Sequence, residues 1–342
     1  MTTGSCTDVT LMTEPSELAA RLRGVLCATV TPFDPATLAV DWGGVRHNVE
    51  WLVSRGIELI LVNGSIGEPT SLSEDEQRRL VRETVDLVAG RAVVIAGCSD
   101  PNPAVVVDRA RDALAAGAKG ILVAPPGAFR LSSAEVVDFF RIVDRDAGAP
   151  LVVYDNPAVA RSSLDLDAIE TLASLPSFAG LKEADPDVVR FQRILDRFGA
   201  QFPVIAAVED PLLFHLVAGA RACMTASAAF APEILRELLA AVEDSDLPRA
   251  RDLFRRIGRF RALFASDLAT GRPAWLPYTK AAIDLVGGRG GPPRPPLRPI
   301  DQAAMERLAE VLVEIGVIDR DRRPGARETS SQDSQSAVME EV

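Results

Sequence analysis

Short apolar runs alternate with segments of helical period along most of the chain. Three of these runs align without gaps, at residues 56–62, 117–123 and 219–225, and each begins with a glycine that precedes a buried strand. Each run follows an amphipathic stretch, and glycine commonly ends a helix, so the repeating unit is a helix followed by a strand. Five more apolar runs bring the predicted strands to eight: residues 24–30, 92–96, 151–153, 178–181 and 203–207.

The apolar strands and the helices between them predict one fold class. Strands that are apolar throughout and alternate with helices are typical of a parallel sheet covered on both faces. Two of the intervening helices open with a capping box, formed by Ser73 with Glu76 and by Ser132 with Glu135. Eight such units over about 220 residues favour a closed barrel over an open doubly wound sheet. We therefore predict an α/β protein, a (β/α)₈ TIM barrel with a C-terminal helical extension.

The chain divides into four predicted segments. After the eighth strand, helical periods recur at about 232–243, 246–269, 276–286 and 301–315, and a Gly/Pro-rich loop at 287–299 separates the last two. The polar composition beyond residue 318 predicts a disordered tail, and roughly the first 20 residues are expected to be loose as well. The predicted boundaries are an N-terminal extension at 1–23, the barrel at 24–243, a C-terminal helical segment at 244–318 and the tail at 319–342.

Composition and charge narrow the range of partners. The 342 residues include 37 Lys+Arg against 48 Asp+Glu, a formal net charge of −11, and the arginines are scattered, which disfavours nucleic acid and anionic membranes. No apolar run approaches the ~18 residues of a membrane span, and residues 1–15 lack a signal peptide's apolar stretch, so we expect a cytoplasmic protein. Four widely spaced cysteines predict buried free thiols: Cys6, Cys27, Cys98 and Cys223.

Among the three lysines of the chain, Lys182 has the position of a catalytic residue. It follows the sixth predicted strand at its carboxyl end, where barrel active sites assemble. Lys119 starts the fourth strand at the opposite face, and Lys280 lies within a late helix, so both are expected away from that face. An amine partly withdrawn from water is disfavoured in its charged form, which leaves a nucleophile that can condense with a ketone. An ion pair with Glu183 is equally consistent with the position of Lys182.

Two further features stand at predicted strand ends. Tyr154 follows the fifth strand, where a phenol can carry protons, although a tyrosine in such a place also serves as a core-edge residue. After the second strand, Gly64 and Gly67 bracket Ser65, so successive N–H groups can form a nest for a carboxylate. A glycine-rich turn also simply reverses the chain.

Metal chemistry is not favoured by the histidines. His47 and His215 fall within predicted helices, on the side away from the strand ends. No carboxylates stand at ligand spacing around them. A metal-dependent reaction at the strand ends is therefore not expected.

Three motifs at the predicted strand ends resemble those of one family. Gly64-Ser-Ile-Gly-Glu68 is similar to Gly-Thr/Ser-x-Gly-Glu, Tyr154-Asp-Asn-Pro157 to Tyr-Asn-x-Pro, and Gly180-Leu-Lys-Glu-Ala184 to Gly-Ile-Lys-Glu-Ala. These motifs, in this order, belong to the dihydrodipicolinate synthase and N-acetylneuraminate lyase superfamily. Residues 28–33, 219–225 and 277–282 correspond as well, and the resemblance extends from about residue 24 to residue 316.

The resemblance implies a class I aldolase, a lyase that needs neither metal nor organic cofactor. Lys182 would form a Schiff base with the 2-oxo group of pyruvate or a related oxo acid, and Tyr154 would relay protons. The hydroxyl of Ser65 and the N–H groups of Ser65 and Ile66 would hold the carboxylate. Its partners would be the 2-oxo acid, an aldehyde and further copies of the chain, as a homotetramer or a dimer. Further candidate substrate-binding residues are Gly64, Arg161 and Thr225.

The departures from the family pattern bear on the substrate. Ile66 replaces a second threonine and so removes a hydroxyl from the proton relay. Residues 124–129 lack the tyrosine pair of the synthases, and Arg161 is the nearest candidate for a displaced arginine. These changes disfavour 4-hydroxy-tetrahydrodipicolinate synthase activity, and Ile66 with Phe33 and Phe129 favours a less polar aldehyde. Three alternatives stay open: a sugar-acid (2-oxo-3-deoxy) aldolase or dehydratase using the same lysine, the synthase itself, and a catalytically silent barrel that serves as a binding or regulatory module.

Overall fold

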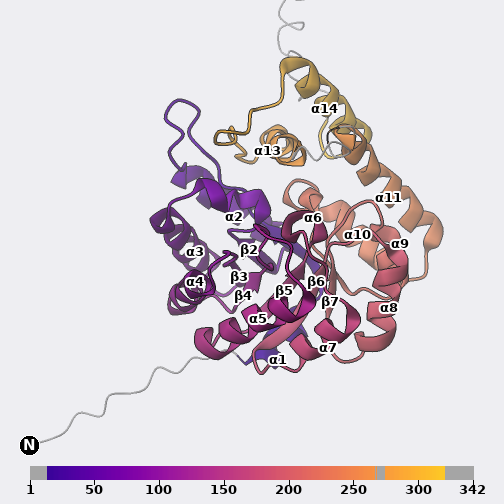
Figure 1. Cartoon of the computed structure of the whole chain (residues 1–342). Helices are drawn as coiled ribbons and strands as arrows, with labels where there is room; N and C mark the ends of the chain where they lie inside the picture. The colour runs from indigo at the N-terminus through magenta and orange to yellow at the C-terminus, as the bar shows by residue number, and fades with distance from the viewer. Residues whose placement is uncertain (1–13, 266, 268–273, 320–342) are drawn as a thin grey trace, which may run out of the picture.

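The eight predicted strands form a closed parallel barrel in chain order (Figure 1). The structure is a computed structural model that describes residues 14–265, 267 and 274–319. Each strand pairs in parallel with the next, and β1 pairs with β8 to close the barrel. The fold prediction is therefore confirmed. The strands are β1 Gly24–Ala28, β2 Leu59–Val62, β3 Val93–Gly97, β4 Gly120–Val123, β5 Leu151–Asp155, β6 Phe178–Glu183, β7 Val204–Ala206 and β8 Ala222–Cys223.

Helices surround the barrel, and their ends follow local sequence signals. Both predicted capping boxes are present. The side chains of Ser73 and Ser132 each accept the backbone N–H of the glutamate three residues later, and the carboxylate of that glutamate accepts the backbone N–H of the serine. A short helix, α6 Pro157–Ala160, follows β5. The helices between strands, and the one after β8, are α2 Trp42–Ser54, α3 Glu74–Val88, α4 Pro103–Ala115, α5 Ser133–Ala147, α7 Leu166–Ala173, α8 Val188–Phe198, α9 Leu212–Val217 and α10 Pro232–Glu243.

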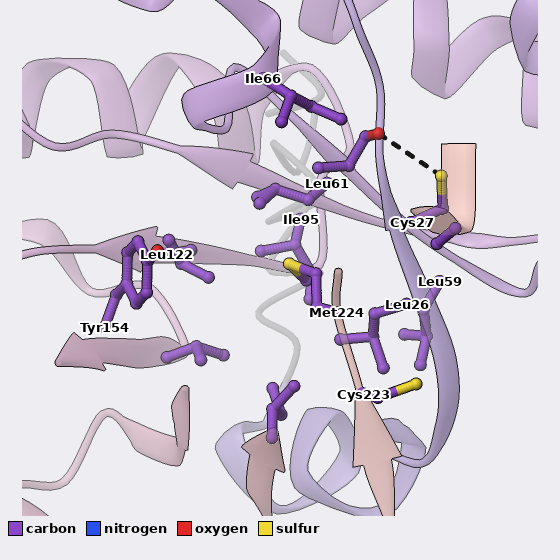
Figure 2. Close-up of a cluster of buried hydrophobic side chains, with 14 of the residues drawn as sticks. Leu26, Cys27, Leu59, Leu61, Ile66, Ile95, Leu122, Tyr154, Cys223 and Met224 are labelled. Carbon is purple, nitrogen blue, oxygen red and sulfur yellow. Dashed lines mark hydrogen bonds between the residues drawn. The ribbon is translucent and has the colours of Figure 1, made fainter. Parts of the chain in front are cut away.

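Apolar side chains from neighbouring strands fill the barrel interior. Leu61, Ile95 and Leu122 are each at most 3% exposed, and Figure 2 shows them in one cluster with Tyr154 and Ile66 at its border. Burial of this apolar surface is the main stabilising contribution to such a fold. The predicted thiols Cys27, Cys98 and Cys223 are free and buried, whereas Cys6 lies outside the described residues.

A short N-terminal helix covers the amino end of the barrel, and this corrects the expectation that roughly the first 20 residues are loose. Helix α1 Pro15–Arg21 contributes Leu18 and the following Leu22, which are 1% and 2% exposed. A Cβ at Gly120 would lie 2.4 Å from Leu18, and one at Gly180 would lie 3.0 Å from Leu22. Burial against the strands therefore orders a segment too short to be stable alone. Residues 1–13 and the predicted tail at 320–342 lie outside the described part of the chain.

The C-terminal helices lie at the other end of the barrel from α1 (Figure 1). The helices are α11 Leu247–Ala262, α13 Trp275–Leu285 and α14 Gln302–Glu314. Helix α13 packs against the turn η3 Ala226–Ala229, which follows β8, and α14 packs on α11 and α13. The predicted loop at 287–299 is confirmed. The predicted helix at 246–269 ends earlier than expected, at Ala262, where Leu263 and Phe264 form a turn. Within the described ranges, no helix is long and apolar enough to cross a membrane.

Candidate active site

The register of two adjacent strands places Lys182 beside Tyr154. The two residues are direct partners in the β5–β6 ladder, so their side chains leave the sheet on the same face. Lys182 Nζ lies 3.6 Å from the centroid of the Tyr154 ring, and both side chains are less than a tenth exposed. Within the described residues, Lys182 Nζ makes no hydrogen bond or ion pair. The amine therefore faces the cavity, and none of the described residues competes for it.

Glu183 does not pair with Lys182, so that alternative is wrong. Successive residues of a strand point to opposite faces, and Glu183 accordingly points out of the barrel. Its Oε2 accepts a hydrogen bond from Arg190 Nη2 at 3.2 Å. Strand alternation thus separates the two charges that are adjacent in sequence.

The Tyr154 hydroxyl is held by a residue that sequence reasoning did not assign. Asn156 Nδ2 donates to the phenol oxygen at 2.7 Å, and Asn156 Oδ1 accepts from the N–H of Ala158 at the start of α6. The hydrogen bond from Ala158 therefore orients the Asn156 side-chain amide, and that amide in turn orients the Tyr154 hydroxyl. Asn156 is part of the Tyr-Asn-x-Pro region, which is the only signal that pointed to it.

The predicted carboxylate loop follows β2 as a short 3₁₀ turn, Ser65–Gly67. Ser65 and Ile66 line the same cavity as Lys182 and Tyr154. Gly64 does not line it and lies buried behind the turn, where a Cβ would come within 2.7 Å of Leu61 Cδ2. The glycine is required because the loop packs directly against β2.

A buried ion pair anchors this loop to the C-terminal segment. Glu68 adopts a left-handed backbone conformation, with φ 56°, which is unfavourable for a side chain of this kind. Its Oε1 accepts Lys280 Nζ at 2.6 Å, and its Oε2 accepts the N–H of Arg294 at 2.9 Å. Lys280 also donates to the carbonyl of Thr31, in the loop after β1.

The position of Lys280 corrects a prediction. Although it lies within α13 as expected, it reaches the loops after β1 and β2 and so belongs to the strand-end face. Burial lowers the pKa of Lys280, and the Glu68 carboxylate opposes that shift. Lys119, in contrast, is exposed just before β4, at the amino end as predicted.

Removal of the Lys280 charge should destabilise the protein strongly. In Lys280→Met, Glu68 keeps a buried charge without its cation, a situation that costs about 3–5 kcal/mol. Urea unfolding followed by circular dichroism measures the change. The double variant Glu68→Gln with Lys280→Met should recover part of the loss because it removes both charges. A loss below about 1 kcal/mol, the size for an exposed pair, would show that the pair does not anchor the loop.

The cavity at the carboxyl ends of the strands has a volume of about 250 Å³. Ser65, Ile66, Tyr154 and Lys182 lie in its lining, and Thr225 adds a hydroxyl that is buried with no partner among the described residues. Arg161 does not line it and is exposed at the end of α6. The structure thus brings together five of the seven predicted site residues.

The remaining lining was not predicted and is mostly apolar. Phe264 and Trp275 come from the C-terminal segment, whereas Phe33 and Phe129, which we expected beside Ile66, do not line the cavity. That detail of the prediction is wrong: Phe129 is 76% exposed, and the Phe33 ring lies under Lys280 and Arg294. Besides Ile66, the apolar lining comes from Ala158, Val159, Val208, Phe264 and Trp275.

Two charged residues of the cavity were also missed. Glu209 follows β7, and its Oε1 accepts the N–H of Ser227 at 2.9 Å. Arg261 of α11 pairs with Asp210 through two hydrogen bonds of 2.8 and 2.7 Å. The strand-end rule that selected Lys182 would also have selected Glu209. No local signal marks Arg261, because a distant helix brings it to the barrel.

The histidines take no part in the cavity. His47 lies on α2 and contacts the carbonyl of Gly287 through Nε2. His215 lies on α9, stacked on Phe191, and burial lowers its pKa to about 4. Within the part of the chain that the structure describes, no group of three or more His, Cys, Asp or Glu side chains could hold a metal ion.

The fold and the cavity define a barrel lyase of the Schiff-base, class I type. The chain belongs to the Dihydrodipicolinate synthetase family, which it matches over residues 21–315. It is 31% identical over 297 residues to 4-hydroxy-tetrahydrodipicolinate synthase of Methanoculleus marisnigri, covering 86% of this chain and 99% of that protein.

Solved structures show the same likeness. Dihydrodipicolinate synthase from Oceanobacillus iheyensis superposes with a TM-score of 0.81 at 25% identity, covering 88% of this chain and 99% of that one. The E. coli K12 prophage protein YagE, solved in complex with pyruvate, gives a TM-score of 0.79 at 25% identity, with 86% and 99% of the two chains covered.

Proposed function

We propose that the protein catalyses reversible aldol cleavage or condensation between pyruvate, or a related 2-oxo acid, and an aldehyde. The observation that carries this proposal is the unpaired Lys182 amine, 3.6 Å from the Tyr154 ring centroid and in one cavity with the Ser65 turn. A relative named as a synthase of this family and a structural neighbour that binds pyruvate support the choice of oxo acid.

Each residue of the cavity has a defined role in the proposed reaction. Lys182 Nζ adds to the C2 carbonyl of the oxo acid, and loss of water gives an iminium ion that acts as the electron sink. Loss of a proton from C3 gives an enamine, whose carbon attacks the aldehyde carbonyl, and hydrolysis releases the product. The Tyr154 hydroxyl, oriented by Asn156, carries protons between these groups.

The Ser65 turn is proposed to bind the carboxylate of the oxo acid. The first N–H groups of a helical turn have no partner within the turn, so those of Ser65 and Ile66 are available to an anion. The exposed Ser65 hydroxyl adds a third donor. The net charge of −11 means that these local donors, rather than the field of the whole molecule, attract the acid.

The lining favours an aldehyde with an apolar body over aspartate semialdehyde. Ile66 offers no hydroxyl to a proton relay, and Phe264 and Trp275 supply apolar surface. We expect kcat/KM for aspartate semialdehyde to be about 10²–10⁴-fold below that of the best aryl or aliphatic aldehyde, the usual cost of lost acid–base assistance. A steady-state comparison with pyruvate as donor measures the ratio. Ile66→Thr, which restores a hydroxyl, should reduce the difference in kcat/KM between the two aldehydes.

Equal efficiency with aspartate semialdehyde in the unmodified protein would instead support 4-hydroxy-tetrahydrodipicolinate synthase activity. A second candidate, a sugar-acid aldolase or dehydratase, is favoured by the unpartnered Thr225 hydroxyl and by Glu209 in the cavity, since both can bind substrate hydroxyls. Glyceraldehyde in the same panel tests it. A preference for glyceraldehyde that Thr225→Val abolishes would decide for the sugar acid.

We also propose that the protein is cytoplasmic and forms a homo-oligomer. Support for self-association comes from exposed apolar side chains on α8 and α9, two helices that pack against one another. Large apolar side chains gathered on a surface commonly mark an interface. The side chains are Val188, Val189, Phe214 and Val217.

A further inference from the structure

Two carboxyl groups lie directly behind the proposed catalytic pair. Asp155 and Glu183 are register partners on β5 and β6, one residue beyond Tyr154 and Lys182. They point out of the barrel, and both are 0% exposed. Any change in how these two carboxyls interact therefore acts on the strand pair that carries Lys182 and Tyr154.

A single guanidinium serves both carboxyls. Arg190 Nη2, from α8, donates to Asp155 Oδ2 at 2.6 Å and to Glu183 Oε2 at 3.2 Å. Asp155 Oδ2 also accepts the N–H of Leu164, and Glu183 Oε1 accepts the N–H of Asp185. Asp155 Oδ1, in contrast, is buried with no hydrogen-bond partner among the described residues. If both groups were ionised, the cluster would hold a buried excess of negative charge, which is strongly unfavourable.

Arg190 is the one cation that faces the two carboxyls among the described residues. Asp185 lies 3.8 Å from Arg190 Nε, and Asp165, at the start of α7, also interacts with Arg190. Burial is the largest cause in both cases: it raises the pKa of Asp155 to about 6, and together with the Asp155 charge it raises the pKa of Glu183 to about 8. Asp155 also stands where the Tyr-Asn-x-Pro motif has asparagine, a residue that carries no charge.

We propose that Asp155 and Glu183 share one proton opposite Arg190, and that this cluster is a positioning element that holds Tyr154 and Lys182 together. With one proton, Asp155, Glu183 and Arg190 are neutral overall and tie β5, β6 and α8 together. When the proton is lost, two carboxylates repel each other across the β5–β6 pair. The positioning role rests on the function proposed above for Lys182 and Tyr154.

The shared proton has a signature that needs no substrate. Unfolding at pH 7 should release about one more proton from the wild type than from Asp155→Asn, since both carboxyls ionise in the unfolded chain. Because the folded pKa values are raised, the cluster stabilises the fold most below about pH 4, and this contribution is lost as the pH rises to about 8. The number of protons released on unfolding is obtained by calorimetry, from how the unfolding enthalpy varies among buffers of different ionisation enthalpy. The slope of Tm against pH should be flatter in the variant.

The positioning role has a separate signature in the pH profile. As the proton is lost with a pKa near 8, wild-type kcat should fall about tenfold between pH 7 and pH 9, with little change in KM. Asp155→Asn and Glu183→Gln should both keep their pH 7 kcat at pH 9. Asp167→Asn is the matched control, because it removes an exposed carboxylate that pairs with Arg197, and it should follow the wild-type profile.

Each measurement can overturn the proposal. Equal proton release from the wild type and Asp155→Asn would show that no proton is shared. If the wild type and Asp155→Asn differ in proton release but have the same dependence of kcat on pH, the cluster does not position the catalytic pair. Should Asp155→Asn fail to fold, Glu183→Gln and the wild-type profile still decide. Failure of the proposed function appears separately, as a wild-type protein that forms no borohydride-stable adduct with pyruvate.

Discussion

Lys182→Ala is expected to abolish turnover and to remove the adduct that borohydride traps in the presence of pyruvate. The amine is the only nucleophile that the protein supplies in the proposed mechanism, and no other lysine lines the cavity. Reduction of the imine makes the bond permanent, so intact mass spectrometry shows the adduct and peptide mapping locates it. Because an enzyme of this class does its chemistry through the imine, we expect no residual turnover above the uncatalysed rate.

The other two lysines provide the controls. Lys119→Ala should keep both the adduct and turnover, because Lys119 is exposed at the amino end of the barrel. Lys280 should remain unlabelled because Glu68 holds it in a buried ion pair. Labelling of either lysine in the wild type would refute the assignment. A wild-type protein that forms no adduct at all would support the alternative of a catalytically silent barrel.

Tyr154→Phe should lower kcat by about 10²–10⁴-fold while leaving adduct formation with pyruvate largely intact. Phenylalanine keeps the ring that Lys182 Nζ contacts at 3.6 Å, and it removes only the hydroxyl that Asn156 orients. The substitution thus separates proton transfer from binding. Stopped-flow or steady-state assays give kcat, and borohydride trapping gives the fraction of enzyme that forms the imine.

Tyr278 offers a matched control. It is the other tyrosine of the chain, lies buried on α13 and does not line the cavity, so Tyr278→Phe should retain wild-type kcat. Asn156→Ala should give a smaller loss than Tyr154→Phe, since it only frees the phenol. Turnover of Tyr154→Phe within about threefold of the wild type would show that another group carries the protons.

The barrel and three residues that line the cavity were predictable from the sequence. All-apolar strands at regular spacing define a parallel sheet, and the strand-end rule then selects Lys182, Tyr154 and Ser65 from many candidates. The rule works because every parallel strand of a barrel ends at the same face. It would also have selected Glu209, which was overlooked because no motif surrounds it.

The partners of these residues were less predictable. Sequence adjacency suggested that Lys182 pairs with Glu183, whereas strand alternation sends Glu183 to Arg190 on α8. The segment around Lys280 looked remote from the active face, yet its helix folds back and the side chain reaches Glu68. Both contacts join residues whose relation depends on how elements are packed.

The sequence by itself thus determined the barrel, the lysine and tyrosine at its strand ends and the glycine-bracketed turn, because these follow from local periodicity and from a topology with one active face. Only the tertiary structure decided which charges neutralise each other and what surrounds the substrate. Arg190 meets Asp155 from 35 residues away, and Trp275 reaches the cavity from the C-terminal segment. Such contacts arise from the packing of distant elements under the demand that buried charges find partners, and no local pattern in the chain encodes them.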